Sequence, residues 1–513
     1  MPAAVMPDPT PQPLDQLAMR GHAQAPALVL REQTLTYAEL RERVALLAGW
    51  LAERAEPGAR VASWAAKGEA TCLLPLAAAR AGLVHVPINP LLKRAQVAHI
   101  LADSGASMLI GTPARLRSLE PGDAPQDCAL HDEDDALREA YDLGQRREPG
   151  TQDPQDLAAI LYTSGSTGAP KGVMLSHANL WLGAVAVAHY LELEEDDVTL
   201  AVLPLSFDYG QNQLLSTWYA GGSVVPLDYL FPRDVAKAVA KHGVTTLAAV
   251  PPLWLQLVEA DWPEGAGDSL RRLTNSGGAL TVDMVQALTA KFPQTKIFPM
   301  YGLTEAFRST FLDPALVRDH PTSMGRAIPF AEVLVIGEDG EVCAPGEEGE
   351  LVHCGPLVAQ GYWQDGARTA ERFRPAPRAS EYGGTAVWSG DRVMRDEDGL
   401  LHFVGRRDAM IKSAGNRISP QEVESAAIAS GYAAEAVALG VPDERLGQAI
   451  HLVVRAPGDV EPDDAALAKA LARELPNFMQ PQAIHWRAAM PVNPNGKLDR
   501  AALAHEIMQG ARS

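Results

Sequence analysis

The stretch TSGSTGAPKG occupies residues 163–172 of this chain. It packs three glycines, four hydroxyl side chains and a lysine into ten positions. Backbone N–H groups and hydroxyls in such a loop can surround phosphate oxygens. It is not a Walker A loop, because Pro170 stands before Lys171 and Gly172 occupies the position that requires Ser or Thr.

The flanks of this loop are apolar. LAAILYT leads into it and has the character of a buried strand, and GVMLSHANL forms another apolar element that leads out of it. A flexible surface linker is the alternative interpretation, but a glycine-rich loop beside a buried strand is usually functional. We therefore expect a phosphate-binding loop at the end of a strand.

Further strand candidates alternate with helical segments. They are RVASWAA, LVHVPIN, VTLAVLPL, GSVVPL and VTTLAAVPP. The segment TYAELRERVALLAGWLAERA has apolar residues at helical spacing, and Thr36 with Glu39 makes a capping box at its start. Continuous apolar strands alternating with helices indicate parallel sheets covered by helices. The sequence therefore predicts an α/β fold.

A second, smaller unit begins near residue 409. SPQEVESAAIAS opens with Ser419, Pro420 and Glu422, a capping box with proline at the first helical position. QAIHLVVRA then predicts a strand and DDAALAKALARELP a helix. We predict a large N-terminal domain over residues 1–407 and a small α+β domain over residues 408–513.

Composition narrows the function. With 44 Lys and Arg against 64 Asp and Glu, the net charge is −20, which argues against nucleic acid or an anionic membrane as a partner. No apolar run approaches the length of a membrane span, and no signal peptide is evident. The four cysteines form no C-x-x-C pair and predict free thiols. We expect a cytoplasmic protein.

Four later stretches allow a more specific interpretation of the loop. They are MYGLTEA (300–306), WSGDRV (388–393), FVGRRDAMIKSAGNRISPQEVE (403–424) and NPNGKLDR (493–500). Together with LYTSGSTGAPKGVMLSH they resemble, in order, the core motifs of the AMP-forming adenylate enzymes. That superfamily includes acyl-CoA synthetases, adenylation domains of nonribosomal peptide synthetases, and luciferases. The resemblance covers roughly residues 25 to 503 and implies a small C-terminal domain that is mobile.

The resemblance implies a two-step ligase. A carboxylate attacks the α-phosphate of ATP and gives an acyl-adenylate and pyrophosphate, with Mg²⁺ as the metal. A thiol of CoA, or of a carrier protein's phosphopantetheine arm, then displaces AMP. A nucleotide-binding member of the family without catalysis, which would not depend on Lys497, is the alternative from another class.

The resemblance also assigns nucleotide-binding residues. The β- and γ-phosphates would contact Thr163, Ser164, Ser166, Thr167 and Lys171. The adenine would lie against Gly277, Gly278 and Tyr301, and the ribose against Asp391 and Arg406. Ser389 stands where the family commonly has Thr, and the hydroxyl is retained.

The catalytic residues implied in the same way are Thr304, Glu305 and Lys497. Thr304 would contact the α-phosphate and Glu305 would bind Mg²⁺, a hard cation suited to a carboxylate. Lys497 would bridge the substrate carboxylate and the α-phosphate. Asp408 matches the hinge of the family's C-terminal domain, and Gly415 lies in the loop expected to line the pantetheine tunnel.

The acyl group is less clear. LPLSFDYGQNQ (203–213) falls where the family builds its acyl pocket, and Asp208 stands where amino-acid-activating members pair with an α-ammonium. Asp208 could instead cap a local turn before Gly210. The predicted pocket residues are Phe207, Asp208, Tyr209, Asn212, Asn275, Met300 and Arg308.

This set is too polar for a long acyl chain, which needs apolar walls. We therefore expect a small polar or amino-acid substrate, with a non-amino carboxylic acid as the alternative. The acceptor is either free CoA or a separate carrier protein.

Overall fold

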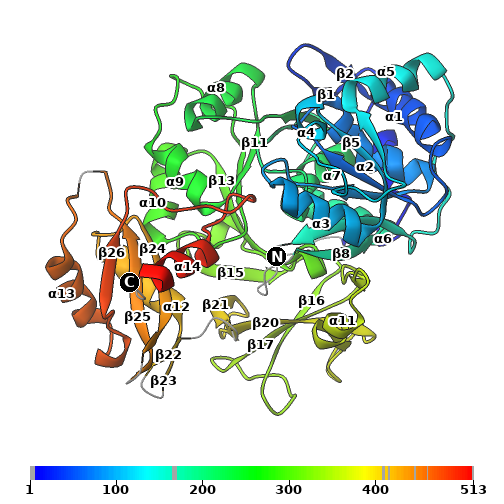
Figure 1. Ribbon diagram of the computed structural model, residues 1–513. Coiled ribbons are helices and arrows are strands. Elements are labelled where there is room, and N and C mark those ends of the chain that lie inside the picture. Colours follow the sequence, from blue (N-terminus) through cyan, green and yellow to red (C-terminus); the bar gives the residue numbers. More distant parts are fainter. Residues whose placement is uncertain are drawn as a thin grey trace.

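The computed structural model describes residues 6–163, 170–406, 411–413, 416–443, 446–458 and 460–510. Within them the chain forms three sheets with helices packed on their faces (Figure 1). The two larger sheets belong to the chain before residue 407 and the smallest to the chain after residue 410. The predicted α/β class, with a large N-terminal part and a small C-terminal part, is confirmed.

The largest sheet has the strand order β16-β17-β20-β21-β15-β14-β13-β12-β11-β9-β10-β1-β2, with β19 beside β20. Its members are β1 (Pro26–Val29), β2 (Thr34–Thr36), β9 (Val198–Ala201), β10 (Ser223–Pro226), β11 (Thr246–Ala249), β12 (Arg272–Asn275), β13 (Lys296–Tyr301), β14 (Thr310–Phe311), β15 (Ser323–Ala327), β16 (Glu332–Ile336), β17 (Glu348–Cys354), β19 (Phe373–Pro375), β20 (Thr385–Arg395) and β21 (Leu401–Arg406). The strands β9 to β13 are parallel, and those from β14 onward are antiparallel.

The second sheet has the order β18-β8-β7-β4-β3-β5-β6. Its members are β3 (Arg60–Trp64), β4 (Val84–Pro87), β5 (Ala106–Gly111), β6 (Ala129–Asp132), β7 (Leu157–Thr163), β8 (Lys171–Ser176) and β18 (Gly361–Tyr362). β7 and β8 form an antiparallel hairpin in which Thr163 pairs with Lys171. Residues 163–172 therefore lie between β7, a strand as predicted, and β8, a second strand where the sequence predicted only an apolar element.

Helices cover both of these sheets. They are α1 (Tyr37–Ala52), α2 (Glu69–Ala81), α3 (Arg94–Ser104), α4 (Pro113–Leu116), α5 (Glu133–Leu143), α6 (His177–Tyr190), α7 (Asp208–Ala220), α8 (Pro232–His242), α9 (Pro251–Glu259), α10 (Val282–Lys291) and α11 (Gly366–Arg372). Short 3₁₀ turns are η1 (Leu14–Met19), η2 (Thr304–Ala306) and η3 (Pro314–Leu316). The capping box of Thr36 and Glu39 forms at the start of α1 as predicted.

The smallest sheet has the order β23-β22-β25-β24, with β26 beside β25. Its elements are β22 (Ile411–Ser413), β23 (Asn416–Ile418), α12 (Pro420–Ala429), β24 (Glu435–Asp443), β25 (Gly447–Arg455), α13 (Asp464–Glu474), η4 (Asn477–Met479), β26 (Ala483–Trp486) and α14 (Arg500–Gly510). It has a hydrophobic core of its own and contacts α9, where Arg455 lies 3.4 Å from Glu259 (Figure 1).

One predicted capping box is wrong. The Ser419 side chain makes no cap at the start of α12; its hydroxyl donates to the carbonyl oxygen of Val404 at 2.7 Å. The hydroxyl thus ties α12 to β21 of the larger part, a tertiary contact that local spacing does not encode. Pro420 does occupy the first helical turn.

All four cysteines are unpaired, as predicted. Among the described residues, none of the helices combines the length and the apolar character that crossing a bilayer requires.

Candidate active site

The site forms where the parallel strands β11, β12 and β13 end, the usual place for a ligand in an α/β sheet. Tyr301 is the last residue of β13, and Thr304 and Glu305 follow on the turn η2. Phe307 closes this turn at φ +56, a strained backbone for a bulky residue. Its fully buried ring packs against Gly183, where a Cβ would come within 2.3 Å of the ring. Burial of Phe307 thus fixes the turn.

Lys171 and Glu305 meet on the side of the predicted polyphosphate site. Lys171 Nζ donates to Glu305 Oε1 at 3.1 Å and to the Tyr362 hydroxyl at 2.7 Å. That hydroxyl donates to the same Glu305 oxygen at 2.6 Å. Burial disfavours the charged Glu305, but the Lys171 charge and the Tyr362 hydrogen bond outweigh it and hold the pKa of Glu305 below its usual value.

Thr163 lies at the entrance of the glycine-rich loop, and its buried hydroxyl has no hydrogen-bond partner among the described residues. A free hydroxyl at this place is available to a phosphate oxygen. Ser164, Ser166 and Thr167 lie outside the described residues, as do Asp408 and Gly415.

Asp391 and Tyr301 form the predicted nucleoside side. The Tyr301 hydroxyl donates to Asp391 Oδ2, and Arg406 Nε lies 3.5 Å from Asp391 Oδ1. Asp391 and Arg406 are paired across β20 and β21, so the sheet register itself brings them together. Burial, and then the Asp391 charge, raise the pKa of Tyr301, which keeps its hydroxyl protonated.

Lys497 reaches this site from the C-terminal unit. Its loop is held by Asn89, whose side-chain amide donates to Pro494 O at 2.8 Å and to Asn495 Oδ1 at 3.0 Å. Gly277, at φ +81, leaves room for the lysine stem, because a Cβ there would lie 2.4 Å from Lys497 Cε. In this structure Gly277 thus admits Lys497, a role that the sequence did not reveal.

The ammonium of Lys497 lies among charges of both signs. Its Nζ is 5.8 Å from the centre of the Phe207 ring. Burial lowers the pKa of Lys497, and the Arg308 charge lowers it further, while Asp208 and Glu305 raise it. A partly desolvated ammonium beside carboxylates is suited to follow charge that develops on a bound anion.

Asp208 begins α7, and its carboxylate faces the turn η2. Thr304 Oγ1 donates to Asp208 Oδ1 at 3.2 Å, and Arg308 lies 4.0 Å from Asp208 Oδ2. The alternative role as a turn cap before Gly210 is wrong, because the hydrogen bond that the carboxylate accepts comes from Thr304. Asp208 therefore links α7 to the turn η2 within the site.

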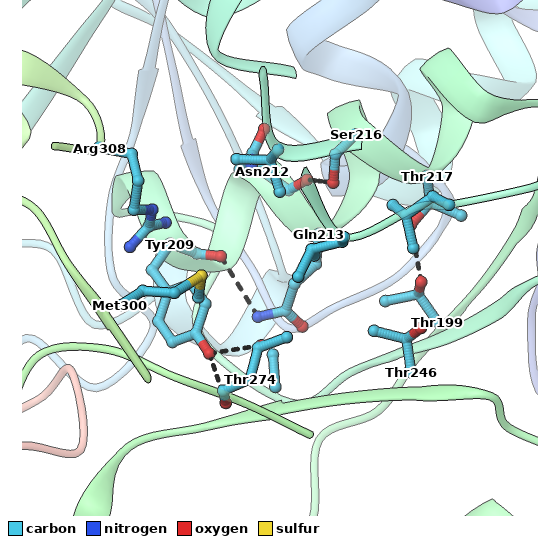
Figure 2. A pocket seen from close by; sticks show the side chains of 14 residues that line it. Thr199, Tyr209, Asn212, Gln213, Ser216, Thr217, Thr246, Thr274, Met300 and Arg308 are labelled. Carbon is cyan, nitrogen blue, oxygen red and sulfur yellow. Dashed lines mark hydrogen bonds between the residues drawn. The ribbon is translucent and has the colours of Figure 1, made fainter. Parts of the chain in front are cut away.

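Arg308 is 1% exposed. Its guanidinium stacks 4.7 Å from the centre of the Tyr209 ring, and Nη1 donates to Ser276 Oγ at 2.9 Å. The Tyr209 hydroxyl is in turn bound to Thr274 at 2.7 Å. These contacts make Arg308 a rigid wall of the predicted acyl pocket (Figure 2).

The other predicted pocket residues differ in role. Asn212 and Met300 line the same cavity as Tyr209 and Arg308 (Figure 2), and Met300 Sδ accepts from the Tyr190 hydroxyl. Asn275 does not line this cavity; its amide donates to Gly278 O at 2.8 Å and holds the turn after β12. Phe207 precedes α7 and contacts the Lys497 side instead.

Tyr362 and Asn89 are site residues that the sequence reasoning missed. Tyr362 lies 191 positions from Lys171, and Asn89 lies 405 positions from Pro494. Tyr362 belongs to none of the stretches quoted above, and Asn89 appears there only as the end of the predicted strand LVHVPIN. Single-sequence spacing holds no signal for contacts at such separations.

The residues at the site fit the groups that the reaction needs. Glu305 offers a carboxylate oxygen for a hard cation, and Lys171, Lys497 and Arg406 offer positive charge around a polyanion. In a protein of net charge −20, such a group of cations is a local exception.

Residues 15–363 match the family model of AMP-binding enzymes, and residues 422–497 match that of the AMP-binding enzyme C-terminal domain. Feruloyl-CoA synthase of an Amycolatopsis species is 33% identical over 482 residues, covering 90% of this chain and 92% of that protein. L-proline–[L-prolyl-carrier protein] ligase of Pseudomonas fluorescens is 32% identical over 499 residues, covering 94% and 96%.

Solved structures agree. ATP-bound MatB from Rhodopseudomonas palustris superimposes with a TM-score of 0.87 at 25% identity, covering 97% of this chain and 99% of that one. O-succinylbenzoate-CoA synthetase of Bacillus subtilis, solved with ATP and magnesium, gives 0.81 at 25% identity, covering 96% and 99%. The chain belongs to the AMP-binding enzyme family and is an ATP- and Mg²⁺-dependent, AMP-forming ligase of carboxylic acids.

Proposed function

We propose that this ligase activates a small polar carboxylic acid as its acyl-adenylate and then transfers the acyl group to a thiol. The observation that carries the proposal is the position of Lys497, which lies against Gly277 and near Phe207, within the influence of both Asp208 and Glu305. An ammonium at this place serves the first half-reaction, in which two anions must approach each other.

In that step one carboxylate oxygen of the acid attacks the α-phosphorus of ATP. A C–O–P linkage forms, the bond between the α-phosphorus and the bridging oxygen breaks, and pyrophosphate leaves. Lys497 and Thr304 would offset the negative charge at the α-phosphate, while Asp391 and Arg406 would hold the ribose and fix the line of attack.

Mg²⁺ supplies charge neutralisation to the phosphates, and Glu305 would bind it. In the present arrangement Lys171 and Tyr362 both bond Glu305 Oε1. The carboxylate is thus kept ionised and oriented, which is the form that a cation requires. Lys171 would then turn its remaining donors to the leaving phosphates, together with the hydroxyl of Thr163.

The second half-reaction would use CoA or the phosphopantetheine of a separate carrier protein. Its thiol would attack the acyl carbon, a C–S bond would form and AMP would leave. The similarity to a feruloyl-CoA synthase supports the first acceptor, and that to a prolyl-carrier-protein ligase supports the second. We place the enzyme in the cytoplasm, where ATP is supplied.

We also propose a division of the chain into residues 1–407 and 408–513, with Asp408 as the hinge and Gly415 in the thiol tunnel. The separate hydrophobic core of the C-terminal sheet supports this division. Rotation about the hinge would withdraw Lys497 after adenylation and would free the path for the thiol.

Within small polar acids, an amino acid is the second candidate. Asp208 would meet its α-ammonium, as the sequence suggested. Against it, Asp208 already has a cation 4.0 Å away in Arg308 and a donor in Thr304. A substrate ammonium is therefore not needed to compensate the buried carboxylate.

Pyrophosphate release from Mg·ATP tests the proposal. The purified protein is given amino acids and the matched acids without the amine, each with and without CoA. We expect release with small polar acids and a loss of at least about a hundredfold in Lys497→Ala. Lys469→Ala, on the exposed face of α13, is the matched control. Absence of release with every acid, in a protein that binds ATP, would refute the ligase proposal.

A further inference from the structure

The cavity beside the proposed acyl site is built from an unusual face of α7. Five residues of this helix, at positions i, i+3, i+4, i+7 and i+8, form a stripe that faces the sheet. They are Tyr209, Asn212, Gln213, Ser216 and Thr217 (Figure 2). Such a stripe normally packs a core and is apolar. Here every member of it carries a polar group, and all five side chains are buried.

The strands opposite continue this polar surface. Thr199 on β9, Thr246 on β11 and Thr274 on β12 line the cavity from the sheet side (Figure 2). Two of these hydroxyls are bonded within the protein, Thr199 to Thr217 and Thr274 to Tyr209, each at 2.7 Å. The cavity is thus lined with hydrogen-bonding groups from both of its walls.

Several of these groups have no partner. Among the described residues, Asn212 Oδ1, Gln213 Oε1, Thr246 Oγ1 and Arg308 Nε are buried polar atoms that no hydrogen bond satisfies. Each such atom costs folding free energy, because the loss of its bonds to water is not compensated. Buried polar groups are retained at this cost where something outside the chain satisfies them.

The unsatisfied set defines the chemistry of the occupant. The amide oxygens of Asn212 and Gln213 accept hydrogen bonds, and Arg308 Nε–H donates one. An occupant that offers both a donor and an acceptor matches this set. A carboxylate has no donor for the amide oxygens, and an ammonium has no acceptor and would meet the Arg308 charge. The group is therefore neutral.

The size of the cavity restricts the group further. Its free space is roughly that of one water molecule. Apolar side chains such as Val187, Leu191 and Met300 make the rest of its wall. This space suits one small polar group at the end of an acyl chain, and it excludes a long alkyl tail.

Resting on the proposed function, we propose that the acid carries a hydroxyl on its acyl chain and that the stripe of α7, with Thr246 and Arg308, binds this hydroxyl. The substrate class is a short hydroxylated carboxylic acid. Discrimination against the acid without the hydroxyl follows, because a hydroxyl donates one hydrogen bond and accepts two, and the parent acid would leave the corresponding polar atoms buried and unpaired.

The test compares three acids at each of several chain lengths: the hydroxy acid, its unsubstituted parent and the matching dicarboxylic acid. Pyrophosphate release is measured with each, and so is the shift of the thermal unfolding midpoint in the presence of a non-cleavable ATP analogue and Mg²⁺. We expect at least about tenfold higher kcat/KM for the hydroxy acid at one length, and a larger midpoint shift with it.

Thr246→Val then removes one partner without changing the shape of the side chain. We expect the preference for the hydroxyl to fall about tenfold, while the unfolding midpoint without ligand stays equal or rises, since Thr246 Oγ1 has no partner to lose. Thr34→Val, at an exposed position of β2, is the matched control and should change neither value.

The outcomes separate the two proposals. Equal kcat/KM for hydroxy and parent acids, or a preference for the dicarboxylic acid, overturns the hydroxyl inference and leaves the ligase reaction standing. Absence of pyrophosphate release with all acids, together with midpoint shifts specific to hydroxy acids, refutes the reaction and supports the pocket assignment. A Thr246→Val protein that keeps the full preference overturns the assignment of Thr246.

Discussion

Substitution of Tyr362 by Phe tests whether the phenol hydroxyl sets the state of the metal-binding carboxylate. The change removes one oxygen atom that accepts from Lys171 at 2.7 Å and donates to Glu305 at 2.6 Å. The ring and its edge contact with Phe373 remain. Hydrogen bonds to charged groups contribute roughly 1.5–3 kcal/mol each. Lys171 and Glu305 stay bonded to each other, so we expect about 1.5–3 kcal/mol to be lost rather than twice that value.

If this free energy positions Glu305 and Lys171 for Mg·ATP, a loss of that size corresponds to a fall of roughly 10- to 150-fold in kcat/KM for ATP. The assay is pyrophosphate release at fixed acid with ATP and Mg²⁺ varied separately, and we expect the Mg²⁺ requirement to rise. Tyr382→Phe, at a site that is 51% exposed, is the control. Unchanged kcat/KM and an unchanged Mg²⁺ requirement in Tyr362→Phe would show that the hydroxyl does not position Glu305 and Lys171.

The same change has a consequence for pH. The pKa of Glu305 is held below its usual value, so its contribution to stability is complete above the unfolded-state pKa and is lost as the pH falls through the lower folded-state pKa. Without the Tyr362 hydroxyl the folded-state pKa rises. We expect the acid-side loss of activity in Tyr362→Phe to begin at higher pH than in the wild type, and a coincident profile would contradict this.

Two further substitutions test the space around Lys497 and a buried ion pair in the protein interior. Gly277→Ala should reduce the adenylation rate at least tenfold, because its Cβ would collide with Lys497. Gly58→Ala has nearly the same φ, +80, but open space around it, and it should leave the adenylation rate unchanged. Equal rates in both variants would show that Lys497 does not need this gap. Asp15→Asn removes the charge of a buried pair with Arg80 at 2.8 Å and should lower the free energy of unfolding by about 3–5 kcal/mol, measured by urea titration; a change below about 0.5 kcal/mol would contradict the charge pairing.

What the sequence predicts well is local or periodic. The strand before Thr163 and the capping box at Thr36 depend on neighbours within a few positions, and both are confirmed. Ser419 has the same local pattern as Thr36, yet its hydroxyl bonds Val404 instead. A tertiary acceptor competes with a local one, and spacing alone does not reveal which of them is nearer.

The candidate site shows the same difference between what local patterns predict and what tertiary contacts decide. The motifs name Lys171, Glu305 and Asp391, and the fold places Lys171 at the start of β8, Glu305 on the turn η2 after β13 and Asp391 within β20. The Asp208–Arg308 contact, with 100 positions between its partners, depends on how the turn after β13 reverses, and that reversal depends on the buried ring of Phe307. Tyr362 enters through β18, a strand of two residues that is too short for any periodic signal.

The two faces of α7 have a consequence for how this enzyme can evolve. The face away from the cavity buries Leu214, Leu215 and Trp218, all of them inaccessible to solvent, and Trp218 also donates to Ala27 O at 2.9 Å. These residues anchor the helix, and on the polar face Tyr209 and Thr217 also bond to the sheet, whereas the side-chain oxygens of Asn212 and Gln213 have no partner among the described residues. Exchange of Asn212 or Gln213 can therefore change which acid is accepted without unfolding the protein, so that descendants can acquire new substrates by few substitutions.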